Sequence, residues 1–286
     1  MDRFDITPAE GARAWPLVNY HTHTWRCQHA RGTELEYVET AIAQGFQALG
    51  FADHTPWPYE SDFVSGMRMR LDQFDGYRRT LLALRDRFAG RIAMPLGLEC
   101  EAFPEYMGWL RDFKAKYLDY AILGNHYDYS DDGDHTLMYP DGGFYFGRCT
   151  RPDAVRRYGE RTLFGMKTGL FDCLAHPDLF LHTYPEFDAD CRAVSRDICQ
   201  AAKQLDMPLE FNLLGFSRHA QELDRGWQGY PNPDFWEIAA ECGCRAIVGF
   251  DAHEPEALER MDLSRAAHCI LDDLHIETLD HLPGIK

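Results

Sequence analysis

The chain has 286 residues and is strongly acidic, with 46 Asp and Glu residues against 29 Lys and Arg residues and a formal net charge of −17. Such a surface repels the phosphates of nucleic acids unless basic residues gather in a patch, and the sequence has no block of Lys or Arg. No apolar run is long enough to span a bilayer, and the first residues lack the pattern of a signal peptide. We therefore expect a cytoplasmic protein with no nucleic-acid or membrane partner, and the sequence leaves a homo-oligomer open.

Short apolar runs alternate with amphipathic segments along the chain. Each run is nearly continuous in apolar character, as strands buried on both faces are. The runs cover residues 17–21, 48–52, 94–98, 120–123, 171–175, 208–212 and 246–250.

Helical segments lie between these runs. Thr33 and Glu36 have the spacing of a capping box, which predicts a helix that continues through about Gln44 and ends at Gly45. Alternating strands and helices predict a parallel sheet, and seven units within one domain favour a barrel, with an open doubly wound sheet as the alternative. The further helical candidates are 72–89, 105–117, 152–168, 190–205 and 233–242, with shorter pieces after Pro255 and around 263–273.

Two connections are longer than usual: residues 55–71 after the second run and residues 127–151 after the fourth. Long loops in compact domains are often binding loops or lids. Both leave the C-terminal end of a predicted strand, where barrel enzymes place their chemistry.

Residues that commonly bind metals lie at the ends of all these runs except the sixth. Residues two apart in a strand share a face, so both members of a His-x-His or Asp-x-His pair can point inward and meet others at one rim. Imidazole and carboxylate groups suit zinc, iron and manganese, and a carboxylate such as Glu99 can bridge two metals. The candidate ligands are His21, His23, His29, His54, Glu99, His126, His176, Asp251 and His253.

The order of these motifs resembles the polymerase-and-histidinol-phosphatase (PHP) family over about residues 17–260. The resemblance implies an α/β fold, a distorted seven-stranded (β/α)7 TIM-like barrel, in a single domain that covers residues 1–286. It also implies three divalent metal ions, zinc, iron or manganese. The motifs are His21-x-His-x5-His29, Asp53-His54, Gly97-x-Glu99, a mid-chain His126, His176-Pro177 and Asp251-x-His253.

The resemblance further implies how these ligands are shared. One metal takes His21, His23, Glu99 and Asp251. Glu99 also reaches a second metal held by His126 and His176. The third metal takes His29, His54 and His253. Three divalent ions carry a charge of +6, and the two carboxylate ligands contribute −2. The site can therefore be positive toward a phosphate although the protein is acidic.

Within the family, the chain is most similar to stand-alone histidinol-phosphatases. The similarity rests on the motif at 21–30, on the Met67–Leu71 loop, and on Leu209–Asn212 followed by Arg218. It implies hydrolysis of a small phosphate monoester, L-histidinol phosphate to L-histidinol and phosphate, with Glu99, Asp251 and His253 as catalytic residues. The Gly124–Tyr127 motif departs from the commoner Ser-Val-His-Tyr pattern, so the sequence specifies a phosphatase more firmly than its substrate.

Arginine suits bidentate phosphate binding because its guanidinium forms a planar fork. Arg218, just beyond the sixth strand, is the first candidate for binding substrate. Arg68, Arg70 and Arg148 lie on the long loops. We interpret them as solvated surface charges rather than as phosphate contacts.

Several other side chains have a predicted supporting role or none. We expect Asp53, Asn212 and Asp178 either to orient ligands or to serve as caps and turns. The aromatic loop residues Trp57 and Tyr59 either cover the substrate or pack the loop. Loop or surface positions are expected for His135, His182, His219, His268, His275 and His281.

The nine cysteines form no CxxC pair, and their odd number argues against a disulfide framework. We interpret them as buried thiols of a reducing compartment. Cys27 differs from the others because it lies among the predicted histidine ligands.

Three other functions stay open. The chain could act on another metabolite phosphate, or as a phosphodiesterase or exonuclease, although the acidic surface and missing aromatic stripe argue against a nucleic-acid strand. It could also bind metal without catalysis, which the complete ligand set argues against.

Overall fold

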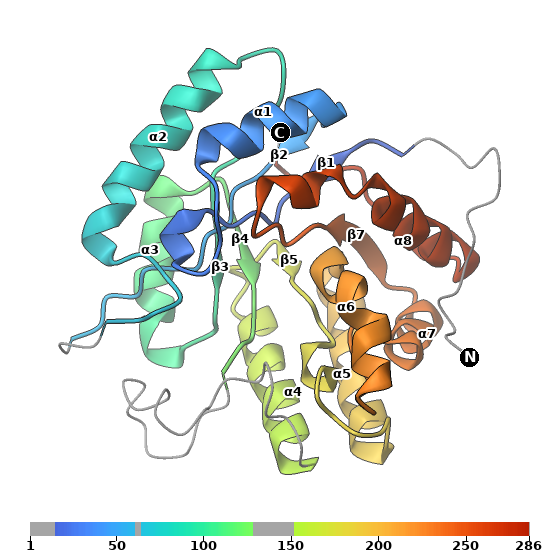
Figure 1. Cartoon of the computed structure of the whole chain (residues 1–286). Helices are drawn as coiled ribbons and strands as arrows, with labels where there is room; N and C mark the ends of the chain where they lie inside the picture. The colour runs from blue at the N-terminus through green and yellow to red at the C-terminus, as the bar shows by residue number, and fades with distance from the viewer. Residues whose placement is uncertain (1–14, 61–63, 128–151, 286) are drawn as a thin grey trace.

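The structure is a computed structural model that describes residues 15–60, 64–127 and 152–285 (Figure 1). Within these ranges every strand pairing is parallel, and helices surround the strands. The predicted α/β fold with a parallel sheet is therefore confirmed. None of the helices in the described ranges is long and apolar enough to cross a bilayer.

The described strands form two sheets. β1 (Val18–Asn19) pairs with β2 (Ala48–Leu49). The second sheet has six strands that lie in chain order. They are β3 (Gly97–Cys100), β4 (Tyr120–Leu123), β5 (Cys173–Leu174), β6 (Leu209–Asn212), β7 (Arg245–Gly249) and β8 (Glu277–Thr278).

The seven predicted strands are present, and β8 is an additional strand that the sequence did not predict. β8 pairs with the outer side of β7 through only two residue pairs. Single bridges join the two sheets, from Phe51 to Leu96 on one side and from Thr22 to Ala252 on the other. The strand pairing of the described residues therefore does not form one continuous closed barrel.

The helices follow the predicted order with one addition. α6 begins directly after β6, and the side chain of Asn212 caps it by accepting a hydrogen bond from the backbone N–H of Gly215 at 2.9 Å. No linker separates this strand from the helix, and Gly215 and Ser217 weaken the helical pattern of the segment. The helices are α1 (Glu34–Gln44), α2 (Phe74–Arg87), α3 (Met107–Tyr117), α4 (Pro152–Lys167), α5 (Ala189–Leu205), α6 (Leu213–Asp224), α7 (Pro233–Cys242) and α8 (Met261–Asp273).

The capping box at the start of α1 is present as predicted. The hydroxyl of Thr33 accepts from the backbone of Glu36, and the Glu36 carboxylate accepts from the backbone N–H of Thr33 at 2.6 Å. Gly45 ends the helix with a left-handed φ of 84°. This cap fixes the point at which the chain leaves the segment that carries His21, His23 and His29.

Two glycines make room for buried carboxylates between the strands. A Cβ atom at Gly124, directly after β4, would overlap the carboxylate of Glu99 on β3. A Cβ atom at Gly249 on β7 would overlap the carboxylate of Glu210 on β6. The small residues therefore allow both acids to occupy the interior of the fold.

We predict that Gly249→Ala lowers the free energy of unfolding by about 1–3 kcal/mol, because the methyl group overpacks the space that Glu210 occupies. Urea denaturation measures this change. Gly108→Ala in α3 is the control, because its Cβ meets no atom within 4 Å, and we expect it to stabilise the protein by about 0.4–1 kcal/mol. Equal effects of the two substitutions would contradict the packing argument.

Candidate metal centre

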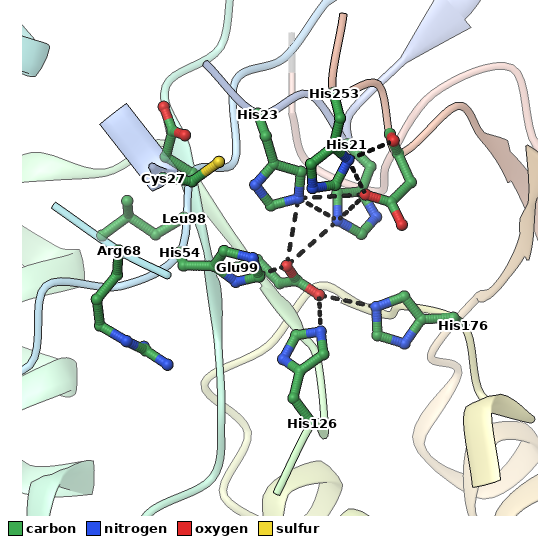
Figure 2. Close-up of polar contacts among 12 residues, drawn as sticks. His21, His23, Cys27, His54, Arg68, Leu98, Glu99, His126, His176 and His253 are labelled. Atoms are coloured by element: carbon green, nitrogen blue, oxygen red, sulfur yellow. Dashed lines mark hydrogen bonds and ion pairs between the residues drawn. The ribbon is translucent and has the colours of Figure 1, made fainter. Parts of the chain in front are cut away.

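The nine predicted ligands lie at or after the C-terminal ends of the strands. Figure 2 shows the convergence on one region of His21, His23, His54, Glu99, His126, His176 and His253. Together the nine residues lie in or after six of the strands, β1 to β5 and β7, as the sequence predicted. Two of them, His176 and Asp251, have left-handed backbones with φ of 29° and 48°. Such conformations are costly for residues other than glycine and cluster at functional sites.

Four donor atoms form the first group. The Nε2 atoms of His21 and His23 lie 3.1 Å apart. Oδ1 of Asp251 lies 3.4 and 3.2 Å from these two nitrogens, and Oε2 of Glu99 lies 3.4 Å from each. These five distances of 3.1–3.4 Å are the spacing expected between pairs of ligand atoms that lie about 2.0 Å from one zinc ion.

The other carboxylate oxygen of Glu99 faces a second group. Oε1 lies 3.1 Å from Nε2 of His126 and 2.8 Å from Nε2 of His176. The two oxygens of one carboxylate thus serve two separate sets of imidazoles. This is the arrangement that a bridging carboxylate requires.

A third group lies toward the surface. Nε2 of His253 and Nε2 of His29 are 3.1 Å apart. His54 is close to this group, because its donor atom lies within 4.8 Å of donor atoms of His23 and His253. Nδ1 of His54 also lies 3.0 Å from Oε2 of Glu99, so this imidazole lies between the first and third groups.

The donor atoms fit divalent metal better than they fit one another. Oε2 of Glu99 and Oδ1 of Asp251 are buried and accept no hydrogen bond within the described part of the chain. The paired Nε2 atoms of His21 and His23 can share one proton at most. A cation between these atoms would satisfy all of them, since buried charges are stable when they are paired or bind metal.

Two of the imidazoles, those of His23 and His54, favour the neutral form that binds metal, whereas His126 favours the protonated form. Burial, followed by the charges of His253 and His54, lowers the pKa of His23 well below its ordinary value. Burial lowers the pKa of His54 to about 3. Burial acts in the same direction on His126, but Glu99 and Glu101 outweigh it and raise its pKa to about 9. Metal binding at His126 would therefore release a proton.

Two buried carboxylates that the sequence analysis missed hold the ligands in place. Oε1 of Glu210 lies 2.7 Å from Nδ1 of His21, and its Oε2 accepts from the backbone N–H of His176 at 3.0 Å. Oε1 of Glu101 lies 3.1 Å from Nδ1 of His126. Glu101 is two residues beyond Glu99 in the chain, and Glu210 is two before Asn212, so the period of a strand was the signal that could have found them.

The predicted supporting residues divide into two kinds. Asn212 donates to Oε2 of Glu210 at 2.9 Å and to Oδ2 of Asp251 at 3.1 Å, so it does orient a candidate ligand. Asp53 accepts from the backbone and hydroxyl of Thr24 at 2.9 and 2.7 Å. Asp178 accepts from the backbone of Asn232 at 2.6 Å. The two aspartates thus join loops, and they position His54 and His176 only through the backbone.

The 55–71 connection is attached to the metal centre through Glu101. Arg68 is only 2% exposed and forms a two-pronged ion pair with Glu101 at 2.9 and 3.0 Å. Nε1 of Trp57 donates to the same carboxylate at 2.9 Å. Arg68 is therefore not the surface charge that we expected, and Trp57 is buried beneath the loop. Trp57, Tyr59 and Arg68 line a cavity of about 170 Å³.

The remaining arginine candidates lie in different settings. Arg70 is exposed and pairs with Asp72, as a surface charge does. Arg218 is exposed on α6. Burial raises the pKa of Tyr230 well above its ordinary value, and the charge of Arg218 opposes this shift; the ring of Tyr230 lies 6.3 Å from that of His176. Arg148 lies outside the described residues.

The histidines without motif support are not all at the surface. His275 and His281 are exposed, as predicted. His182 lies in a turn, as predicted, but it is buried and lies 2.8 Å from Glu222. The prediction was wrong for His219 on α6 and His268 on α8, which are buried. Charge compensation and helix packing remove these side chains from solvent. His135 lies outside the described residues.

We predict that Arg68→Met lowers the free energy of unfolding by about 3–5 kcal/mol, because it leaves the buried Glu101 carboxylate without its cation. The double variant Arg68→Met/Glu101→Gln should recover part of this loss. Arg70→Met is the matched control on the same loop, and it should leave the urea midpoint unchanged because its ion pair is exposed. A similar loss in both single variants would contradict a specific role for the buried pair.

Known proteins share both the sequence pattern and the fold. The family model of the PHP domain matches residues 19–213. A Deinococcus radiodurans protein named "Probable histidinol-phosphatase" is 31% identical over 251 residues, which cover 84% of this chain and 87% of that protein. A Schizosaccharomyces pombe protein of the same name is 25% identical over 262 residues, covering 83% and 81%.

A solved structure agrees with these sequence matches. Histidinol phosphate phosphatase from Lactococcus lactis, in complex with zinc, L-histidinol and phosphate, superposes with a TM-score of 0.73 at 18% identity. The match covers 96% of this chain and 99% of the L. lactis chain. The family match spans more than half of the chain, and it includes seven of the nine candidate ligands. The chain therefore belongs to the PHP domain family.

Proposed function

We propose that the protein is a metal-dependent phosphatase that hydrolyses L-histidinol phosphate to L-histidinol and phosphate, a step of histidine biosynthesis. The observation that carries this proposal is the pair of donor groups on opposite oxygens of Glu99. The names of the D. radiodurans and S. pombe relatives support the reaction. The zinc, L-histidinol and phosphate in the L. lactis protein support the substrate.

The proposed centre holds three divalent ions of zinc, iron or manganese. His21, His23, Asp251 and Glu99 would hold the first, and Glu99, His126 and His176 the second. His29, His54 and His253 would hold the third. Bound metal supplies Lewis-acid activation of the phosphoryl group and a nucleophile at neutral pH.

The side chains around these ligands contribute orientation. Glu210 fixes the ring of His21, and Glu101 fixes the ring of His126, each through the nitrogen that does not face Glu99. Partners of this kind set the tautomer and direction of a histidine ligand. Arg218 would hold the phosphate of the substrate, because a guanidinium matches phosphate oxygens in a bidentate geometry.

A distorted barrel is the arrangement that best explains how the ligands meet. The backbone N–H of His23 donates to Ala252 at 2.9 Å, and that of Ala252 donates to His21 at 3.1 Å, so the end of β1 lies beside the end of β7. On the other side, a bridge joins His54 to Glu99. We propose one domain of this kind; a cytoplasmic location and a homo-oligomer stay predictions.

Removal of metal with a chelator should reduce hydrolysis of L-histidinol phosphate to background, because no side chain replaces the Lewis acid. Adding zinc, iron or manganese should restore it. Elemental analysis checks that the metal has left, and chelator saturated with calcium is the control. Full activity in verified metal-free protein would contradict the proposal. A panel of metabolite phosphates and single-stranded DNA, compared by kcat/KM, would identify a different substrate.

Arg218→Ala should raise KM for L-histidinol phosphate about 10- to 100-fold, because a charged hydrogen bond contributes about 1.5–3 kcal/mol. Steady-state kinetics measure this change. Arg79→Ala is the control, since Arg79 is an exposed residue of α2 whose Nε donates to the backbone carbonyl of Asp75 in the same helix at 3.2 Å. An unchanged kcat/KM in the Arg218 variant would reject its role.

A further inference from the structure

Cys27 is a metal-binding side chain that the proposed ligand sets leave unused. It ends a short 3₁₀ turn (Trp25–Cys27) and is 0% exposed. Gln28 then turns the chain with a left-handed φ of 69°, which places His29 back toward the cysteine. The turn therefore encloses Cys27 beside a candidate metal ligand.

The sulfur lies among donor atoms of the third group. Sγ of Cys27 and one donor atom each from His29 and His253 all lie within 4.8 Å of one another. The same sulfur also lies within 4.8 Å of donors from His23 and Asp53. Figure 2 shows it beside His23, on the side of the ring that faces away from Glu99. It therefore lies at the edge of the centre, next to the third group.

A second observation indicates that a ligand belongs in this region. His23 is fully buried, and its Nδ1 atom has no hydrogen-bond partner among the described residues. A buried polar atom without a partner usually marks a missing ligand or water. Because Nε2 of His23 faces Asp251, the unpartnered nitrogen is on the other side of the ring.

Charge gives the physical reason for a sulfur ligand. The first two donor groups contain carboxylates, from Glu99 and Asp251, which offset the charge of a metal. The proposed third set of His29, His54 and His253 contains only neutral imidazoles. A thiolate from Cys27 would supply the missing negative charge, and zinc–thiolate bonds are about 2.3 Å long.

We propose that Cys27 binds, as a thiolate, the metal that His29 and His253 hold, and that it selects zinc or iron over manganese at this position. The S–H bond breaks, its proton passes to water, and the sulfur electron pair forms the bond to the metal. Soft thiolate ligands favour zinc and iron over manganese. This inference rests on the metal centre of the proposed function.

Burial opposes the thiolate in the absence of metal. Removing a charged sulfur from water is costly, so an enclosed thiolate needs a cation beside it. A coordinating cation reverses this preference, because it deprotonates a thiol outright. Metal binding and loss of the thiol proton therefore occur together.

The test is the spectrum of the full-length protein loaded with cobalt(II). A thiolate ligand gives an intense sulfur-to-cobalt charge-transfer band in the near ultraviolet, whereas histidine and carboxylate ligands give only weak visible bands. We expect the charge-transfer band in the wild-type protein and its loss in Cys27→Ser, with the visible bands retained. Cys191→Ser is the control, because this buried cysteine lies on α5 and its sulfur faces the backbone of Glu186, and it should keep the band.

The metal preference gives a second measurement. Cys27→Ser should weaken zinc binding at one site about 10-fold or more while manganese binding stays unchanged. X-ray absorption of the wild-type cobalt protein needs no variant, and it should show a cobalt–sulfur distance. Absence of that distance, or a band that persists in Cys27→Ser, would overturn the proposal. Hydrolysis of L-histidinol phosphate is measured separately on the wild-type protein, so its failure would count against the proposed function alone.

Discussion

The carboxylate of Glu99 is the group on which the rest of the site depends. It is 1% exposed and ionised, and its two oxygens face five imidazoles from four segments of the chain. Burial raises the pKa of such an acid, but His126, His21 and His54 hold it well below its ordinary value. A buried charge of this kind is stable only when opposite charges or metals surround it. Gly124, directly after β4, leaves the space that the Glu99 carboxylate occupies.

Buried polar residues around Glu99 connect the candidate ligands to the surrounding helices and loops. Glu210 contacts a ligand side chain, the backbone of another ligand and Asn212, which in turn caps α6 and reaches Asp251. Glu101 connects His126 to Arg68 and so to the 55–71 loop. Because each acid has two oxygens with different partners, a shift in the loop or in α6 moves a candidate metal ligand. The stability of the fold and the geometry of the site are therefore coupled.

The sequence predicted that the candidate ligands converge, because the physics behind their placement is local. Strand period and parallel direction place residues such as His21, His126 and Asp251 at one edge without any knowledge of packing. The start of α6 was missed, since Asn212 ends a strand and caps a helix at once. The roles of Glu210 and Arg68 were missed because an ion pair between distant segments is a property of packing, and a charged residue in a sequence reads as a surface residue. The pairing of β8 with β7 was missed because it too is a contact between separate segments that depends on packing.

The left-handed backbones of His176 and Asp251 have a consequence for engineering. A non-glycine residue in this conformation costs of order 1–3 kcal/mol. Glycine at either position would relieve that cost, and a screen that selects only for heat resistance would be drawn to such replacements. The same replacements remove a candidate ligand. In this protein the search for thermostability and the retention of activity therefore compete at the same two residues, and a useful screen must select for both at once.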